Sequence, residues 1–435
     1  MLDTETTLNI TRTHESGAAN TFRICEDPPV FVRGDGPWLF DESGARWLDM
    51  VCGSSTTNLG HNHPAHIAAI EEVAATGFIH TGTRLPSPFR AQLYQMLCEI
   101  LPAELSCIQL VNSGAEAIEA AIKVAQYTTG RARLISFEGG YHGRTLGALS
   151  VTHGARIRNP FSVFEETVDF LPYPYLDDPT GQGKDAAFCL SHLSDRLDQL
   201  KRAGDLPAAV IVEPIQGVGG VVVPPDAFVT GVRDITRSFD VLLVCDEIWS
   251  GFGRTGRWYS YEHAGITPDI VTMGKALSGG LPLSAVAAAP DILKAWPPGM
   301  HTSTFQGNPI SCNMACANIR TIRDDNLLSH IADTVAPELE TALRPLQTLD
   351  RVHAVRINGA QAAVELLTAS GKPDSDAVTR LQKAALDRHI LIYAGGWYGN
   401  AVMFVPPVNI DRQVLADGLK TIAELIGQEV GTQHE

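Results

Sequence analysis

Three groups of residues have types and positions that could do chemistry together. Ser113, Gly114 and Ala115 form a turn of small residues after the apolar run "CIQLV" and before an alanine-rich segment. Asp246 ends the apolar run "VLLVCD", and Lys275 directly follows "DIVTMG". Ligands of open α/β sheets bind outside the carboxyl ends of the strands, and all three groups are expected at that edge.

Each group has a chemical use and an ordinary alternative. Backbone N–H groups at a helix start form an anion site suited to a phosphate, or the turn is only a capped helix with Glu116 in its first turn. A desolvated lysine at a strand end can form a Schiff base, or it is a solvated loop residue. An aspartate beside a heteroaromatic nitrogen makes the ring an electron sink, or it is a structural acid. Together, the three groups meet the requirements of pyridoxal 5′-phosphate: a phosphate site, a partner for the ring nitrogen and an amine for the aldehyde.

The elements that must position these residues alternate along the chain. From about residue 107, short apolar, β-branched runs alternate with helix-like segments, as in "CIQLV", "ARLISF", "AAVIVEP", "VLLVCDE" and "DIVTMG". This alternation predicts an α/β fold with a mostly parallel central sheet covered on both faces. Pro, Asp and Gly accumulate between Pro172 and Lys184, which predicts a surface excursion there.

The pattern changes after Cys312. A long helical pattern runs from Met314 toward Leu346, followed by strand-like "AVRINGAQAAVELL" and by the amphipathic segment "DAVTRLQKAALDRHI". We therefore expect an N-terminal segment at 1–60 that packs with the small domain, a large cofactor-binding domain at 61–318 and a smaller α/β C-terminal domain at 319–435.

The bulk composition excludes several classes of protein. The chain has 435 residues and 44% of them are hydrophobic, which is typical of a globular protein with more than one domain. Its formal net charge is −16 and no basic block stands out, so no nucleic-acid partner is expected. Neither a secretory signal nor a membrane span is expected from the pattern. Eight cysteines without a C-x-x-C pair indicate a reducing, cytoplasmic location.

A longer set of segments resembles one enzyme family. The segments cover nearly the whole chain and include "LGHNHPAHIAAI", "NSGAEAIEAAIKVAQYTTGR", "FEGGYHGRTLGALSVT", "VIVEPIQGVGGVVVPP", "LLVCDEIWSGFGRTGRW", "PDIVTMGKALSGGLPLSAV" and "HTSTFQGNP". The sequence resembles the class III (ornithine/4-aminobutyrate type) aminotransferases, which are pyridoxal-phosphate enzymes of fold type I. The resemblance implies transfer of an amino group between an amino acid or amine and a 2-oxo acid, through a Schiff base on Lys275.

The same resemblance implies roles for individual residues. Lys275 and Asp246 would be catalytic, and Ile248 and Tyr141 would press on opposite faces of the cofactor ring. Thr304 would reach the phosphate of the partner subunit's cofactor, which implies a homodimer. The other cofactor-binding residues implied by the resemblance are Ser113, Gly114, Ala115, His142 and Glu213.

Some positions depart from the family's pattern and bear on substrate binding. Met403 stands where the family usually has an arginine, so the bidentate clamp for the substrate carboxylate is missing. Trp249 replaces a common glutamine that hydrogen-bonds the cofactor, and Gln306 replaces a frequent glycine. Arg144 is the preferred remaining candidate for carboxylate binding, ahead of Arg84, although a structural ion pair is an equal alternative for Arg144. We expect a pocket more apolar than that of ornithine-type enzymes.

Other functions fit parts of the sequence. An amino-acid or amino-lactam epimerase on the same scaffold needs nearly the same residues, so the motifs do not separate it from an aminotransferase. The G-x-G-x-x-G pattern at 251–256 is typical of dinucleotide binding, but "DEIWS" separates it from the strand and we expect a turn-rich loop. The histidines of "GHNHPAH" are expected to form a structural turn and no metal site, because no acidic or cysteine partner lies nearby.

Overall fold

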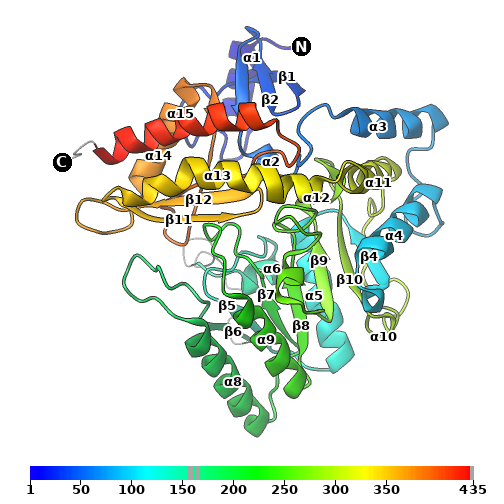
Figure 1. The fold of residues 1–435 in the computed structure, drawn as a ribbon. Coiled ribbons are helices and arrows are strands. Elements are labelled where there is room, and N and C mark those ends of the chain that lie inside the picture. Colours follow the sequence, from blue (N-terminus) through cyan, green and yellow to red (C-terminus); the bar gives the residue numbers. More distant parts are fainter. Residues whose placement is uncertain (155–157, 159–160, 162–166, 432–435) are drawn as a thin grey trace.

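A seven-stranded sheet forms the centre of the molecule (Figure 1). The computed structural model describes the chain except residues 155–157, 159–160, 162–166 and 432–435. In spatial order the strands are β4 (Cys107–Val111), β10 (Ser284–Ala288), β9 (Ile270–Met273), β8 (Leu242–Asp246), β7 (Ala209–Val212), β5 (Leu134–Phe137) and β6 (Val168–Leu171). Only β10 runs antiparallel to its neighbours within this sheet, so the α/β class with a mostly parallel sheet is confirmed.

The strands of this sheet are buried on both faces, which explains their continuous apolar sequences. Alternate residues enter two different hydrophobic clusters. Val210, Leu243 and Val271 pack on the side of helices α8 (Ala186–Ala203) and α9 (Asp226–Ser238). Their neighbours in the strands pack on the other side, with helix α5 (Gly114–Thr129).

A second sheet lies in the C-terminal part of the chain. Its order is β11 (Val352–Asn358), β12 (Gln361–Leu366), β15 (Ala401–Phe404) and β14 (Tyr393–Gly395), with all pairs antiparallel. A third sheet joins the two ends of the chain, because β13 (Ile390–Leu391) pairs in parallel with β3 (Arg46–Asp49), next to β2 (Trp38–Asp41) and β1 (Phe31–Asp35). The first fifty residues therefore share a sheet with a C-terminal strand.

The remaining helical segments connect and cover these sheets (Figure 1). They are α1 (Thr4–His14), α2 (Cys52–Ser55), α3 (Pro64–Thr76), α4 (Pro88–Ile100), η1 (Ala103–Leu105), α6 (Leu146–Val151), η3 (Ser260–Ala264), η4 (Lys275–Ser278), α10 (Pro290–Leu293), α11 (Pro309–Asp324), α12 (Leu327–His330), η5 (Ile331–Val335), α13 (Ala336–Leu343), η6 (Arg344–Thr348), α14 (Ser375–Asp387) and α15 (Arg412–Gly431). Residue 318, where the sequence suggested a domain boundary, lies inside α11. That helix packs against α3 and α4 and ends just before Asn326, whose φ is +53°.

Two local expectations need correction. The helical pattern from Met314 to Leu346 is not one helix, since it breaks at Asn326 and passes through a π-helical turn at η5. The segment from Pro172 to Lys184 is not wholly a surface excursion, because Tyr173 and Tyr175 are buried. Their hydroxyl groups donate to Glu213 O at 3.0 Å and to Glu365 at 2.6 Å, and these contacts hold the segment inside.

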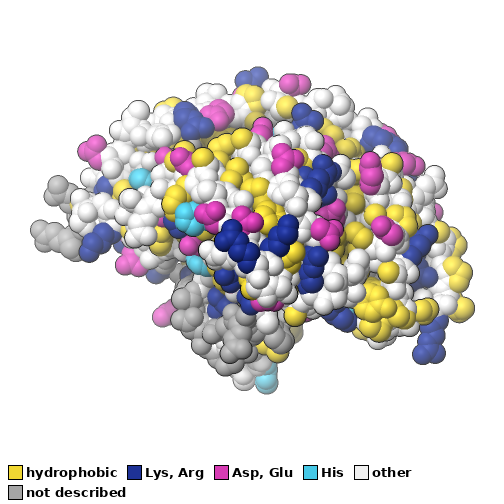
Figure 2. Space-filling view, turned by 90° about the horizontal axis from the view of Figure 1, so that it is seen from below, with side chains coloured by type: hydrophobic (Ala, Val, Ile, Leu, Met, Phe, Trp, Pro, Cys, Tyr) yellow, Lys and Arg dark blue, Asp and Glu magenta, His cyan; other side chains and the backbone are white. Residues whose placement is uncertain are grey.

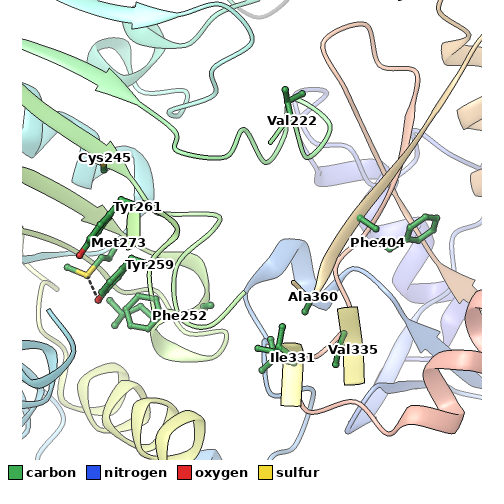
Figure 3. Packing of buried hydrophobic residues seen from close by; sticks show 14 of the residues in the cluster. Val222, Cys245, Phe252, Tyr259, Tyr261, Met273, Ile331, Val335, Ala360 and Phe404 are labelled. Carbon is green, nitrogen blue, oxygen red and sulfur yellow. Dashed lines mark hydrogen bonds between the residues drawn. The ribbon is translucent and has the colours of Figure 1, made fainter. Parts of the chain in front are cut away.

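The glycine-rich loop 251–256 joins the large domain to the C-terminal sheet. Arg254 is almost completely buried, and its Nη1 donates to Ala360 O at 3.0 Å and to Pro406 O at 2.6 Å. Figure 3 shows the cluster around this junction, in which Tyr259 O–H donates to Met273 Sδ at 3.1 Å. The loop therefore serves as a structural joint in this fold.

Acidic and basic side chains lie side by side on the face shown in Figure 2. Several of the basic residues on the chain pair with acidic ones, for example Arg133 with Asp205 at 2.7 Å and Arg196 with Asp169 at 2.9 Å. Within the described residues, no helix is long and apolar enough to cross a membrane.

Candidate active site

The three groups of residues that could take part in chemistry meet at one edge of the central sheet. Strand β8 ends at Asp246, β9 ends two residues before Lys275, and β4 ends two residues before Ser113. Because β10 is antiparallel to both β4 and β9, strand β4 runs in the same direction as β9. The carboxyl ends of β4, β8 and β9 therefore face the same side.

The small-residue turn starts helix α5 beside Ile248. Ser113 is the N-cap, and its Oγ accepts a hydrogen bond from Glu116 N at 3.3 Å. A Cβ on Gly114 would lie 2.9 Å from Ile248 Cγ2, so only glycine fits without a shift. A Cβ on Gly143 would lie 2.8 Å from Ala115 Cβ, which brings the loop after Tyr141 and His142 onto the same turn.

Asp246 and His142 form a buried pair. Asp246 Oδ2 lies 2.7 Å from His142 Nδ1, while Oδ1 accepts from Ile248 N at 3.0 Å and from Thr272 Oγ1 at 3.1 Å. Burial lowers the pKa of His142, but the hydrogen bond and charge of Asp246, with Glu213, outweigh it and leave that pKa raised. The histidine thus holds the carboxylate in place.

Glu213 lies beside this pair and connects it to the neighbouring loops. Its Oε1 accepts from Tyr141 N at 2.7 Å and its Oε2 from Gly217 N at 3.1 Å. Burial raises the pKa of Glu213 to about 7, against the lowering effects of His142 and of the two N–H donors. The carboxyl group fixes the backbone at Tyr141, and with it the position of the aromatic ring.

Lys275 is partly buried at the start of η4, with φ at +38°. Burial lowers the pKa of its amine, while the charges of Asp246 and Glu213 raise it by less. Its Nζ lies 4.5 Å from the centroid of the Trp249 ring. A lysine with a lowered pKa and a strand-end position suits both covalent bonding to an aldehyde and proton transfer.

Trp249 and Met403, which the sequence suggested as substrate-binding residues, both pack inside the protein. Trp249 is only 4% exposed, and its Nε1 donates to Gln361 Oε1 at 2.8 Å, so the N–H is already used within the protein. Met403 is fully buried, and a Cβ on Gly395 would lie 2.2 Å from its Sδ. Both side chains belong to one apolar cluster between the large domain and the C-terminal sheet.

Arg144 is exposed and lies above Tyr141, with its Cζ 5.9 Å from the ring centroid. Among the described residues no carboxylate lies within ion-pairing distance of Arg144, so the alternative of an internal ion pair finds no support there. Arg84 is also exposed.

Thr304 is not joined to the other site residues by any hydrogen bond in the described part of the chain. It is exposed, and its carbonyl accepts from His80 Nε2 at 2.6 Å. Around it the apolar side chains of Ile79, Leu85 and Phe305 are more than half exposed.

Glu247 is a buried acid that sequence reasoning did not select. It follows Asp246 directly and accepts hydrogen bonds from Ser250 Oγ at 2.6 Å, Ser260 Oγ at 2.7 Å and Tyr261 N at 2.8 Å. Burial raises its pKa to about 7, although these donors lower it. In the sequence, Glu247 is marked only by its position directly after Asp246 at the end of a strand. This position does not indicate which of the two carboxylates faces the core.

We expect the Glu247→Gln variant to remove part of the pH dependence of stability. The pKa of Glu247 is higher in the folded protein than the value of 4.5 for a free side chain. Its contribution is therefore fully present below about pH 4.5 and is lost as the pH rises toward 7, by about 3 kcal/mol in total. Urea unfolding at pH 5 and pH 7.5 measures this loss, with exposed Glu424→Gln as the control. An unchanged pH dependence in Glu247→Gln would contradict the assignment.

The residues at this edge fit pyridoxal 5′-phosphate. Helix α5 starts with the N–H groups of Gly114 and Ala115 free of partners among the described residues, which suits a phosphate. A buried carboxylate supported by His142 suits a protonated ring nitrogen, and an enclosed lysine suits an aldehyde. The absence of a side chain at Gly114 lets this turn pack closely against Ile248.

The histidines of "GHNHPAH" have the contacts of a structural turn. His61 Nε2 lies 2.9 Å from Asp49 Oδ2, so the expectation that no acidic partner is near is wrong, because β3 brings Asp49 back to this turn. His66 Nε2 lies 3.2 Å from Asn318 Oδ1. No group of three or more His, Cys, Asp and Glu residues with metal-binding geometry occurs among the described residues.

The fold and this arrangement define a pyridoxal-phosphate enzyme of fold type I. The chain belongs to the class-III aminotransferase family, whose model matches residues 25–426. It is an aminotransferase that uses pyridoxal 5′-phosphate to move amino groups between an amino compound and an oxo acid.

Several known proteins are similar to this chain over most of their length. It is 34% identical to the diaminobutyrate–2-oxoglutarate aminotransferase of Haemophilus influenzae, covering 92% of this chain and 90% of the relative. It is 33% identical to the 4-aminobutyrate aminotransferase of Mycobacterium leprae, covering 92% and 91%. Among solved structures, an (S)-enantioselective omega-transaminase from Thermomicrobium roseum is 29% identical with a TM-score of 0.89, covering 99% of both chains.

Proposed function

We propose that the amino donor of this aminotransferase carries no carboxylate on its reacting carbon, because the C-terminal domain has no arginine at the usual position to bind one. The observation that carries this proposal is the burial of Met403, at the position where the family usually has the clamping arginine. Because Met403 is fully buried, it does not touch the donor itself, but it leaves no positive charge at this place that could bind a carboxylate. Donors with a hydrocarbon substituent at that place are therefore favoured over 2-amino acids.

The C-terminal sheet supports this apolar wall. Met403 pairs with Ala363 on one side and with Tyr393 on the other, both in antiparallel register. Directly opposed residues of antiparallel strands point to the same face, so these three side chains form one row. The row packs with Trp249, whose ring centroid lies 6.0 Å from that of Tyr393.

We assign the chemical steps to this chain's residues as follows. The bound cofactor supplies an electron sink for the carbon that loses its proton. Lys275 would bind the cofactor through Nζ and, when that amine is free, would accept on Nζ the proton that leaves the donor's carbon. Asp246 keeps the proton on the ring nitrogen, and His142 holds Asp246. Tyr141 and Ile248 position the ring from its two sides.

A half-reaction without an acceptor tests the proposal. Mixing the holoenzyme with a simple arylalkyl or aliphatic amine should convert the cofactor absorbance to that of the pyridoxamine form, and 2-amino acids should do so more slowly. Faster conversion by 2-amino acids would contradict the proposed donor class. Exchange of the donor's carbon-bound proton in heavy water, with inversion and without conversion to the pyridoxamine form, would indicate an epimerase instead.

Arg144→Ala is expected to raise KM for the carboxylate-bearing acceptor by about 10–100-fold, with little change in kcat. The exposed guanidinium of Arg144 above Tyr141 is placed to form charge-assisted hydrogen bonds with an entering carboxylate. Steady-state kinetics with a 2-oxo acid measures the change, and Arg84→Ala is the matched control. The Arg144 assignment fails if its variant leaves the apparent affinity for every carboxylate substrate unchanged.

We also propose a homodimer in which Thr304 reaches the phosphate of the cofactor in the partner subunit. The exposed apolar side chains around Thr304 support an interface there. Phe305→Asp is expected to shift the protein toward monomers in sedimentation experiments. Leu176→Asp is the control, because Leu176 is 65% exposed and Phe305 66%. Equal behaviour of both variants, or a monomeric wild type, would rule the interface out.

We propose a reducing, cytoplasmic location for the enzyme. All eight cysteines lie in the described part of the chain, and each is unpaired, including the exposed Cys98. Fractionation of the source cells with detection of the native protein tests the proposal, and recovery outside the cytoplasm would contradict it.

A further inference from the structure

The proposed function does not explain the position of the Trp249 side chain at this site. It stands three residues after the strand-end carboxylate, at a position where the family resemblance implies a polar contact to the cofactor. In this structure its N–H donates a hydrogen bond to Gln361, and its ring lies under the amine of Lys275. The indole therefore faces the catalytic lysine directly.

The geometry fixes the indole from two sides. A Cβ on Gly217 would lie 2.2 Å from Trp249 Cγ, so the backbone of that glycine packs directly against the ring. Gln361 is completely buried at the start of β12, and its Oε1 accepts the indole N–H at 2.8 Å. The turn before β12, next to Gln361, is also fixed, because Ala360 N donates to Arg254 O at 2.8 Å. A ring held in this way cannot swing away from the lysine without breaking a buried hydrogen bond.

The distance between the amine and the ring is that of a cation–π interaction. Nζ of Lys275 lies 4.5 Å from the ring centroid, and tryptophan is the strongest aromatic partner for an ammonium group. The charged groups that act on this amine are Asp246, at the end of β8, and Glu213, after β7. Both carboxylates are also engaged elsewhere, with His142 and with backbone N–H groups, whereas the indole face lies 4.5 Å from the amine.

We propose that Trp249 is a positioning residue that holds the protonated amine of Lys275 over its ring whenever that lysine is not bonded to the cofactor. This includes the interval in which Lys275 carries the proton taken from the donor. The inference deepens the proposed function and rests on Lys275 being the cofactor lysine. Its consequence is a lysine whose charged amine stays over the Trp249 ring at the edge of the sheet, although the residue is partly buried.

The test measures the titration of Lys275 in the apoprotein, where the amine is free. Trace labelling with acetic anhydride between pH 6 and 11, followed by mass spectrometry of the Lys275 peptide, gives its titration curve relative to exposed Lys420. In Trp249→Leu the midpoint should fall by about 0.5–1.5 pH units, because the ring's contribution to the charged form is lost. Trp249→Phe, which keeps an aromatic face without the indole N–H, should recover at least half of the shift. Trp296→Leu removes an indole near Lys123 and should leave the Lys275 curve unchanged.

Two results would overturn the inference. One is a Trp249→Leu curve that coincides with that of the wild type or moves upward. The other is a Trp249→Phe curve equal to that of Trp249→Leu, which would assign the effect to the hydrogen bond with Gln361 instead of the ring. Stoichiometric uptake of pyridoxal phosphate by each variant shows that it is folded.

A second measurement covers a leucine variant that does not fold. The intrinsic fluorescence of the wild-type apoprotein should show a step at the titration of Lys275, and this step should vanish in Trp249→Phe and in Lys275→Met. A step that persists in Lys275→Met would contradict the inference. Because these experiments contain no substrate, the proposed donor class can fail while this inference stands. If borohydride reduction attached the cofactor to a lysine other than Lys275, Lys275 would not be the cofactor lysine, and both the proposed function and this inference would fail.

Discussion

Replacing Lys275 by alanine is expected to lower kcat by about a thousandfold or more. The enclosed amine is the only lysine that the structure places beside Asp246 and Glu213 among the described residues. With the roles proposed above, its loss would remove both the covalent attachment of the cofactor and the group that accepts the donor's proton. Single-turnover spectroscopy of the variant with a saturating amine measures the rate of proton removal directly.

Lys275→Arg is the matched control for this prediction. It keeps a positive charge at the position, but its guanidinium neither bonds to the aldehyde nor loses a proton near neutral pH. Borohydride treatment of the wild type should attach the cofactor to the peptide that contains Lys275. An alanine variant within tenfold of wild-type activity would show that another group transfers the proton.

Asp246→Asn is expected to lower kcat by about 10²–10⁴-fold while the variant still binds the cofactor. The amide is neutral, so it no longer favours a proton on the ring nitrogen, and the ring becomes a weak electron sink. His142 should respond as well, since the hydrogen bond and charge of Asp246 are what raise its pKa above the effect of burial. Stopped-flow absorbance of the half-reaction measures the rate.

His142→Gln provides the comparison for Asp246→Asn. It leaves the carboxylate and removes only the group that holds it at 2.7 Å, so a smaller loss of rate is expected. In addition, the histidine resonance of His142 in NMR spectra should titrate at lower pH in Asp246→Asn than in the wild type. Equal losses of rate in both variants, or an unchanged histidine titration, would argue against the assigned roles.

The positions at the edge of the sheet could be predicted because they follow directly from strand ends. Apolar β-branched runs specify the strands, and a residue after such a run must lie at the sheet's edge. For this reason Asp246 and Lys275 could be brought to one place from sequence alone, although the contact between Asp246 and His142 could not. The two residues are far apart in the chain, and no local pattern records their pairing.

The orientation of Trp249 could not be predicted, because it depends on a residue more than a hundred positions away, and that of Met403 depends on the pairing of its own strand. Gln361 takes the indole N–H, and Gly395 leaves room for the Met403 side chain only after β14 has paired with β15. The left-handed backbone of Cys52, Gly53, Ser54 and Ser55 was equally hidden, since only one of these four residues is a glycine. Such features depend on tertiary contacts that override local preference.

The buried guanidinium of Arg254 has a consequence for how the protein is synthesised. Its hydrogen-bond acceptors are carbonyl groups of Ala360 and Pro406, which leave the ribosome about a hundred or more residues after the arginine itself. Until then the loop that follows the cofactor strand has no place to bury its charge, and burying an unpaired guanidinium is costly. A nascent chain that ends before residue 360 should therefore keep this loop sensitive to protease.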